Sequence, residues 1–265
     1  MSRGPRVPAG RSFVELVFAR QRATLAVVLV GVPLACWLWV IALTRDMYGT
    51  MSGPAAWMMT ASWDAAYLLL LWAMWAAMMT AMMLPSAAPF VLLYARASRQ
   101  RSEPDADALP VYALAGGYLL VWGAFSVGAT LLQLALAGSG LLTPMMEAAS
   151  PLAAGVPLLL AGLYQFTPLK QACLRSCRAP LPFMRTRWRR GAGGALRMGA
   201  EHGAYCLGCC WALMLLLFAG GVMNLFVVLA LTVWVAVEKL APFGALSSRL
   251  IGALLVSAGL WVSLR

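Results

Sequence analysis

The sequence predicts an all-α polytopic membrane protein with about seven transmembrane helices. Of its 265 residues, 62% are hydrophobic and only 11% are charged, a composition that is too apolar for a soluble domain of this size. Several apolar runs without charge also reach about 18 residues or more, the length that an α-helix needs to cross a bilayer. We therefore expect a single transmembrane helical domain over residues 1–265, with the lipid bilayer as its first partner.

The positive charges indicate how the spans are oriented. The formal net charge is +11, and most Lys and Arg residues lie in short stretches between apolar runs. Residues 1–22 carry five arginines and one acid, while residues 168–199 carry eight basic residues and no acid. Basic stretches beside spans mark the cytoplasmic side rather than a nucleic-acid surface. We expect a cytoplasmic N-terminus, a basic cytoplasmic loop at 168–199, a C-terminus outside, and no nucleic-acid partner.

The seven expected spans are separated by charges, glycines and prolines. They cover about 24–44, 63–94, 110–137, 151–167, 199–221, 224–237 and 245–264. The first follows the basic N-terminus without a small-residue cleavage site, which indicates an uncleaved helix rather than a signal peptide. The second contains Pro85 and Pro89, and proline removes a helical hydrogen bond, so we expect a kink there.

Glycines mark where the later spans are expected to pack closely. Gly116, Gly117, Gly123 and Gly128 lie in the third span, and Gly199 and Gly203 open the fifth. Small residues let helix backbones approach each other in a membrane. The fourth span ends at the basic loop, the fifth starts from it, and a charged turn divides the sixth from the seventh.

The densest chemistry in the chain lies at the start of the fifth span, in residues 201–211. This stretch holds the only histidine and three of the six cysteines. Each helical residue turns by about 100°, so His202, Cys206 and Cys209 fall within an arc of roughly 60°, and Cys210 lies just beyond it. Three or four potential ligands would then share one helix face, which predicts a metal site.

A second cysteine pair, Cys173 and Cys177, precedes this stretch within the basic loop. Disulfides are uncommon on the cytoplasmic side, so metal binding or thiol redox chemistry is favoured over a structural staple. The surrounding positive charge favours the thiolate form that either chemistry needs. Cys36 is isolated in the first span, and we expect it to be inert and buried.

Methionines in the second span extend the set of soft ligands. Met78, Met82 and Met83 lie on neighbouring rows of the expected helix just before Pro85. Copper(I) prefers thiolate and thioether ligands, whereas zinc prefers four tetrahedral thiolate or imidazole ligands. Because only copper(I) gives the methionines a role, it is the favoured metal, with zinc as the alternative. Core packing is the alternative role for the methionines themselves.

The two sulfur groups are expected at a similar depth. At about 1.5 Å per residue, Cys209 lies roughly 15 Å from the cytoplasmic start of its span. Met82 and Met83 lie roughly 18–20 Å from the cytoplasmic end of theirs. We therefore expect the second and fifth spans to be in contact, with the two groups meeting near Cys209.

Three ionisable residues at cytoplasmic span ends are further site candidates: Glu201, Glu238 and Lys170. Charged groups at such positions usually pair, and Lys170, Lys239 and Arg197 are the expected cations. The sequence has no serine-centred elbow, no phosphate-binding glycine loop and no H-E-x-x-H motif. It therefore does not predict an enzyme of hydrolytic type.

Four blocks together resemble the bacterial predicted metal-binding integral membrane proteins, a domain family of unknown function. The blocks are residues 78–87, residues 164–170 with Cys173 and Cys177, residues 202–211, and residues 223–225 with 238–240. The resemblance implies that the matching cysteines, His202 and the Met-Pro segment are metal determinants. It also implies a multi-pass location in the bacterial inner membrane.

These observations favour a copper(I) carrier, chaperone or metal-centre assembly factor over other functions. Its expected partners are a protein that donates or accepts the metal and, in a homo-oligomer, further copies of the chain. A membrane thiol–disulfide oxidoreductase is one alternative, with Cys173/Cys177 and Cys209/Cys210 as exchanging pairs. A vicinal pair forms an awkward disulfide, which counts against it. A scaffold subunit with a structural zinc site is the other alternative.

Overall fold

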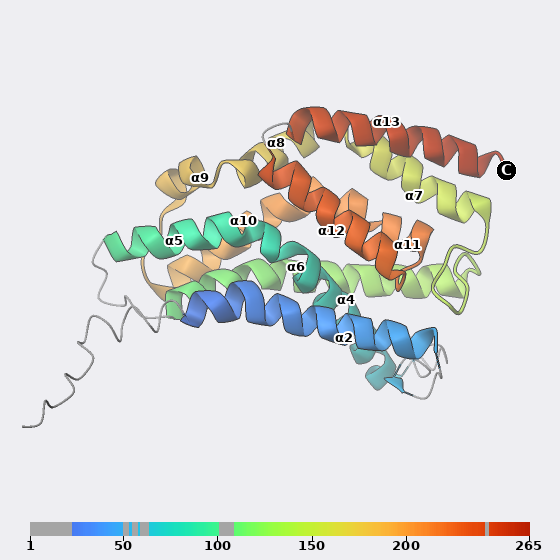
Figure 1. The fold of residues 1–265 in the computed structure, drawn as a ribbon, viewed down its shortest axis with the longest axis horizontal. Helices are drawn as coiled ribbons and strands as arrows, with labels where there is room; N and C mark the ends of the chain where they lie inside the picture. The colour runs from blue at the N-terminus through green and yellow to red at the C-terminus, as the bar shows by residue number, and fades with distance from the viewer. Residues whose placement is uncertain (1–22, 50–52, 55–57, 59–63, 101–108, 242–243) are drawn as a thin grey trace, which may run out of the picture.

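Long apolar helices run side by side through the computed structural model of the protein (Figure 1). The structure describes residues 23–49, 53–54, 58, 64–100, 109–241 and 244–265, so the basic segment 1–22 lies outside the described residues. Within this part of the chain there is no β-strand, only an isolated bridge between Leu142 and Ala148. The all-α class is confirmed.

The described helices follow one another along the chain. They are η1 (Val27–Gly31, π-helical), α2 (Val32–Met47), α4 (Ala65–Met83), η2 (Pro85–Ala87, 3₁₀), α5 (Ala88–Gln100), α6 (Leu109–Gly138), α7 (Pro151–Tyr164), α8 (Pro168–Arg178), α9 (Pro180–Arg187), α10 (Gly191–Met214), α11 (Leu216–Gly220), α12 (Leu225–Leu240) and α13 (Gly244–Ser263).

Several of these helices are long and apolar enough to cross a membrane. Five stretches of the described chain qualify: Ala23–Met47, Ala65–Gln100, Leu109–Gly138, Gly191–Gly220 and Leu246–Ser263. A sixth is added if α7 and α8, which are bent by 69° to each other, form one broken span. The 16-residue α12 is not among them. The count of seven and the orientation of the termini therefore stay predictions.

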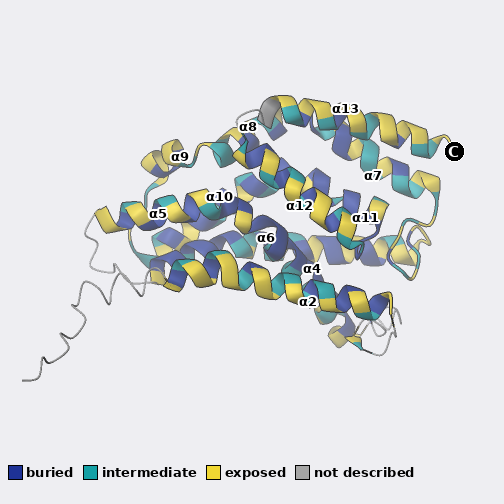
Figure 2. Ribbon diagram, in the orientation of Figure 1, coloured by how far each residue is buried: buried dark blue, intermediate teal, exposed yellow. Residues whose placement is uncertain are grey.

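The outer helices present apolar side chains outward, while the methionine face of α4 is buried. Leu38 on α2, Leu120 on α6 and Leu254 on α13 are 61–64% exposed. Figure 2 shows exposed positions along α2 and α13, the outermost helices in that view. Contiguous apolar exposure of this kind is costly in water and suits a lipid environment. By contrast, the methionines of α4 are at most 1% exposed.

The kink expected at Pro85 is present, and it frees a backbone acceptor. α4 ends at Met83, and a 3₁₀ turn joins it to α5. Because the Ala87 amide donates to the Leu84 carbonyl, the Met83 carbonyl has no helical partner. It accepts hydrogen bonds from Ser86 Oγ at 2.8 Å and from Tyr118 on α6 at 3.0 Å instead. The break at the end of α4 thus provides the acceptor that holds Tyr118 of α6 against α4.

Most of the basic segment 168–199 is helical, and its cytoplasmic location stays a prediction. α8, α9 and the first turns of α10 fill it. Thr167 caps α8 by accepting from the Lys170 amide, and Pro168 occupies the first helical turn, which is a typical helix start. Lys170, Cys173 and Leu174 form the buried face of α8. α8 is therefore an amphipathic helix, which the high arginine content of the segment obscured in the sequence.

Two glycines allow α6 and α10 to pack backbone against backbone. A Cβ atom added at Gly117 would overlap the backbone of Leu196, and one added at Gly199 would overlap the backbone of Leu114. The predicted role in close packing is therefore confirmed at these two positions. It is wrong for Gly123 and Gly128, where an added Cβ would meet nothing within 4 Å.

The substitution Gly199→Leu tests this contact. We expect it to destabilise the bundle by about 1–3 kcal/mol, because α10 must move away from α6 to make room. The measurement is thermal unfolding of the full chain in detergent. Gly128→Ala is the matched control and should change stability by no more than about 1 kcal/mol. Equal stability of the Gly199→Leu variant and the wild type would contradict the close packing.

Candidate metal centre

Four buried or half-buried thiols converge where α8 lies against α10. The Cys209 sulfur is 3.2 Å from the Cys210 sulfur and 3.9 Å from the Cys177 sulfur on α8. Cys206 takes part in the same set of thiol interactions. Cys206, Cys209 and Cys210 are at most 2% exposed, so the helix face expected from their spacing points into the core.

Gly208 is the reason that α8 comes so near. A Cβ atom at this position would lie 2.6 Å from the Cys173 sulfur, so a larger residue would push that side chain away. The Tyr164 hydroxyl, at the end of α7, donates to the Gly208 carbonyl and fixes the corner between α7 and α8. Cys173 therefore packs against the α10 backbone, while Cys177, one turn further on, reaches Cys209.

A buried lysine from α12 lies beside this thiol group. Lys239 Nζ donates to the Cys206 sulfur at 2.9 Å and to Ser86 Oγ at 3.0 Å, and it lies 3.9 Å from the Met83 sulfur. A buried ammonium group is costly unless it is paired. No carboxylate forms an ion pair with it in the part of the chain that the structure describes. Its neighbours are sulfur and hydroxyl groups.

Tyr118 completes the surroundings of Cys206, and sequence reasoning missed it. Its hydroxyl donates to the Met83 carbonyl at 3.0 Å and lies 3.0 Å from the Cys206 sulfur. A tyrosine hydroxyl in an apolar span must find a polar partner. That requirement, together with the neighbouring Gly117, was the signal in the sequence that could have identified it.

The methionines of α4 share a buried core with the thiols. Met83 approaches the thiol group through Lys239, and Met78 and Met82 are buried in the same core. The break at Pro85 brings the end of α4 to the level of Cys206 through Lys239, while the expected meeting at Cys209 stays a prediction. α4 and α10 do not pack along each other, and α6 packs against both.

His202 lies one turn before Cys206 in an aromatic cage. Its ring stacks on Phe90 with centroids 4.0 Å apart, and Phe183 and Tyr118 flank it at 5.7 and 6.1 Å. The buried Nδ1 atom has no hydrogen-bond partner among the described residues. The histidine thus lies beside the thiol group, but no hydrogen bond connects it to a sulfur among the described residues. Its Nδ1 atom is left without a hydrogen-bond partner.

The three ionisable candidates are engaged in ion pairs away from the thiols. Lys170 and Glu238 pair at 2.7 Å, both fully buried, and Ser248 donates to the same carboxylate at 2.9 Å. Glu201 pairs with Arg197 and Arg187 at 3.2 Å on the exposed rim of the bundle. The pairings expected from the sequence with Lys170 and Arg197 are present. The Lys170–Glu238 pair joins α8 to α12, and the Arg187–Glu201 pair joins α9 to α10.

The thiols do not form a ready-made cage of three or more ligands. Within the described residues, no group of three or more His, Cys, Asp or Glu side chains is arranged to hold a metal ion. Structural zinc needs four donors around one point, whereas copper(I) accepts few soft donors. All six cysteines are free, and Cys36 is half-buried on α2 rather than buried as expected.

The sequence model of one protein family matches most of this chain. The family is described as PpoB2, copper chaperone, and the match covers residues 72–262. The chain belongs to the PpoB2 copper chaperone family. The matched region begins in α4 and includes α8, α10 and α12, so it contains every residue of the thiol group and Lys239. No curated protein and no solved structure matches the chain.

In this PpoB2 family member, the close approach of α8 to α10 can be tested by oxidation. Diamide removes two electrons and two protons from a pair of thiols, and we expect it to link Cys177 to Cys209, since their sulfurs are 3.9 Å apart. Peptide mapping by mass spectrometry measures the link. Gly208→Leu should reduce it by displacing Cys173, while Gly193→Leu, where an added Cβ meets nothing, should not. An unlinked Cys177 in the wild type would contradict the geometry.

Proposed function

We propose that this protein is a multi-pass copper(I) chaperone of the bacterial inner membrane that carries copper(I) on a thiol group beside a buried lysine. Its ligands are drawn from Cys177, Cys206, Cys209 and Cys210. The observation that carries the proposal is the convergence of these thiols from two helices at Lys239. Membership of a family described as copper chaperones supports it.

Charge balance explains why a lysine suits a copper(I) site. Thiols lose their protons when they bind a metal, so copper(I) held by two thiolates has a net charge of −1. A buried anion needs a counter-charge, and Lys239, 2.9 Å from the Cys206 sulfur, supplies it. The loaded site is then neutral inside an apolar bundle. Zinc with two thiolates is already neutral, so beside Lys239 the loaded site would carry a net charge of +1.

Neighbouring soft donors allow the metal to pass from one ligand pair to the next. Copper(I) needs only some of the four thiols at a time, so one thiolate can enter as another leaves. Met83 continues the series toward Met82 and Met78 on the buried face of α4. The unpaired Nδ1 of His202 is an additional donor one turn before Cys206. Exchange of this kind needs no external energy when the affinities are similar.

A protein that donates or accepts copper is the expected partner. On the orientation argued from the sequence, Cys177 lies on the cytoplasmic side, and it is the most exposed member of the thiol group. Arginines of α9 and α10 surround Glu201 on the same side. A partner with an acidic surface would suit this rim. A homo-oligomer remains compatible with the lipid-facing helices.

One observation favours the thiol–disulfide oxidoreductase as a second candidate. The 3.9 Å approach of Cys177 to Cys209 is close enough for the pair to interconvert between thiols and a disulfide. Metal analysis and thiol counting on the purified protein separate the two functions. Bound copper and free thiols support the chaperone, whereas a reducible disulfide without bound metal supports the oxidoreductase.

Replacing the central thiols tests the ligand set. We expect Cys206→Ser/Cys209→Ser to lower copper(I) affinity at least about 100-fold, since a hydroxyl is a poor ligand for a soft metal. Anaerobic competition with a chromophoric copper(I) chelator measures it on the full chain in detergent. Cys36→Ser is the matched control and should bind like the wild type. Unchanged affinity in the double variant would overturn the proposal.

Replacing the lysine tests the charge argument. Lys239→Met should weaken copper(I) binding about tenfold or more, because the site then becomes a buried anion without a counter-charge. Lys239→Arg keeps the charge and should retain most of the affinity. The same chelator competition provides the measurement, with thermal unfolding as the check on folding. Equal affinities for Lys239→Met and the wild type would show that the lysine does not balance the metal complex.

A further inference from the structure

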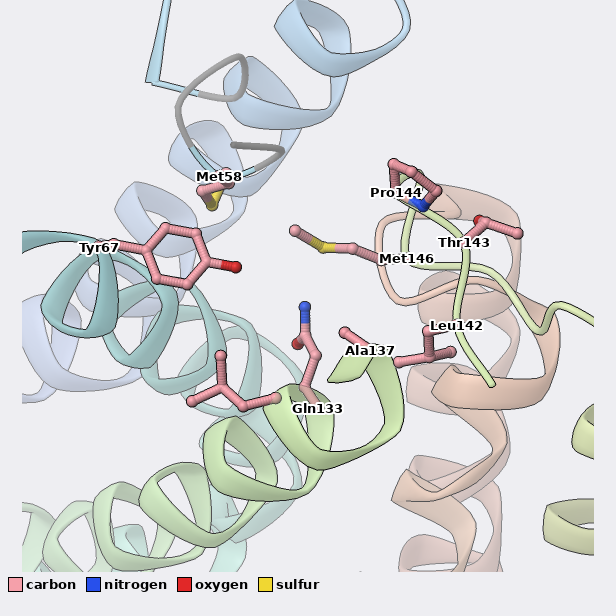
Figure 3. Close-up of a pocket in the computed structure, with 9 residues that line it drawn as sticks. Met58, Tyr67, Gln133, Ala137, Leu142, Thr143, Pro144 and Met146 are labelled. Carbon is pink, nitrogen blue, oxygen red and sulfur yellow. The ribbon is translucent and has the colours of Figure 1, made fainter. Parts of the chain in front are cut away.

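A cavity lies at the opposite end of α4 from the thiol group (Figure 3). Its volume is ≈170 Å³. The start of α4, the end of α6 and the loop before α7 form its walls. It is lined by Met58, Tyr67, Gln133, Leu134, Ala137, Leu142, Thr143, Pro144 and Met146. Tyr67 is 16 residues before Met83 on α4, so the cavity is roughly 24 Å from the thiol group.

Two thioethers face this cavity from different segments. Figure 3 shows the side chains of Met58 and Met146 directed into it, together with the Tyr67 hydroxyl and the Gln133 amide. Both methionines are buried, at 2% and 4% exposure. Their sulfur atoms border the open space of the cavity (Figure 3).

The backbone at Met146 supports a role for its side chain. Its φ angle of 58° lies in the left-handed region, where a long side chain is unusual and glycine is the common choice. The Met146 amide donates to the Thr143 carbonyl, and the Met146 carbonyl accepts from the Val222 amide, so the turn is held on both sides. This turn directs the thioether inward, toward Met58 (Figure 3).

The polar groups around the cavity do not compete for a cation as strong ligands. Gln133 Oε1 accepts from Trp75 at 2.6 Å, which leaves the amide NH₂ group of Gln133 toward the cavity. Glu147, the residue after Met146, is exposed and accepts from the Tyr48 hydroxyl. The Glu147 carboxylate is not one of the groups that line the cavity.

We propose that Met58 and Met146 form a second copper(I) site at the far end of the methionine row from the thiol group. The proposal rests on the function proposed above. Met74, Met78, Met82 and Met83 lie between the two sites, all buried on α4. Neutral thioethers bind copper(I) without the charge of a thiolate, so this site is weaker and exchanges metal more readily. On the predicted orientation it faces the oxidising side, where cysteines would form disulfides and methionines do not.

Copper(I) titration of the full chain in detergent tests this site, with a weak chromophoric chelator under anaerobic conditions. We expect the wild type to bind about one weak copper(I) ion per chain beyond the thiol-bound metal. Met58→Leu/Met146→Leu should lose this weak ion and keep the tight one, because leucine preserves the volume but not the ligand. Met47→Leu, a buried methionine outside the cavity lining, is the matched control and should keep both.

Failure of this site and failure of the thiol site give different results. If Met58→Leu/Met146→Leu, shown to be folded by thermal unfolding, binds as much weak copper(I) as the wild type, the second site is overturned. A wild type with no weak ion at all overturns it too. If Cys206→Ser/Cys209→Ser retains the tight ion, the function proposed above fails instead. Loss of only the tight ion in that variant supports both sites.

Discussion

The placement of one ammonium group inside an apolar helix bundle constrains much of this structure. Lys239 is buried on α12, and three other parts of the chain supply its neighbours: Met83 at the end of α4, Ser86 in the turn after it, and Cys206 on α10. Such a charge is tolerated in an apolar interior only where polar or anionic groups surround it. The break at Pro85 is therefore part of the site, since it presents both Ser86 and the Met83 carbonyl.

The helix packing brings further residues to the thiols beside Lys239. Gly117 and Gly199 let α6 approach α10, which brings Tyr118 within 3.0 Å of Cys206. Gly208 lets α8 approach α10 from another side, which brings Cys177 to Cys209. Close backbone packing thus determines which thiols meet. In the proposed function, the lysine then balances the charge of copper(I) on two of these thiolates, and the methionines of α4 lead away from it.

Local patterns predicted the helices and the cysteine face, but they could not predict which helices meet. Apolar run length identified the long helices, and the spacing of Cys206, Cys209 and Cys210 placed them on one buried face. The helices within the segment 168–199 were not predicted, because its arginine content outweighed the Thr-Pro helix start. The meeting point at Cys206 depends on a kink and on Tyr118 from a third helix. The depth of a residue along a single helix does not show which residues of other helices it meets.

The central claim is that copper(I) binds through thiols at Lys239. X-ray absorption at the copper edge, on the full chain loaded anaerobically with copper(I) at less than one ion per chain, tests it most directly. We expect sulfur to be the dominant neighbour of the metal in the wild type. In the variant Cys206→Ser/Cys209→Ser, we expect lighter atoms to replace sulfur around the metal. Coordination by nitrogen or oxygen in the wild type, or a spectrum unchanged in that variant, would contradict it.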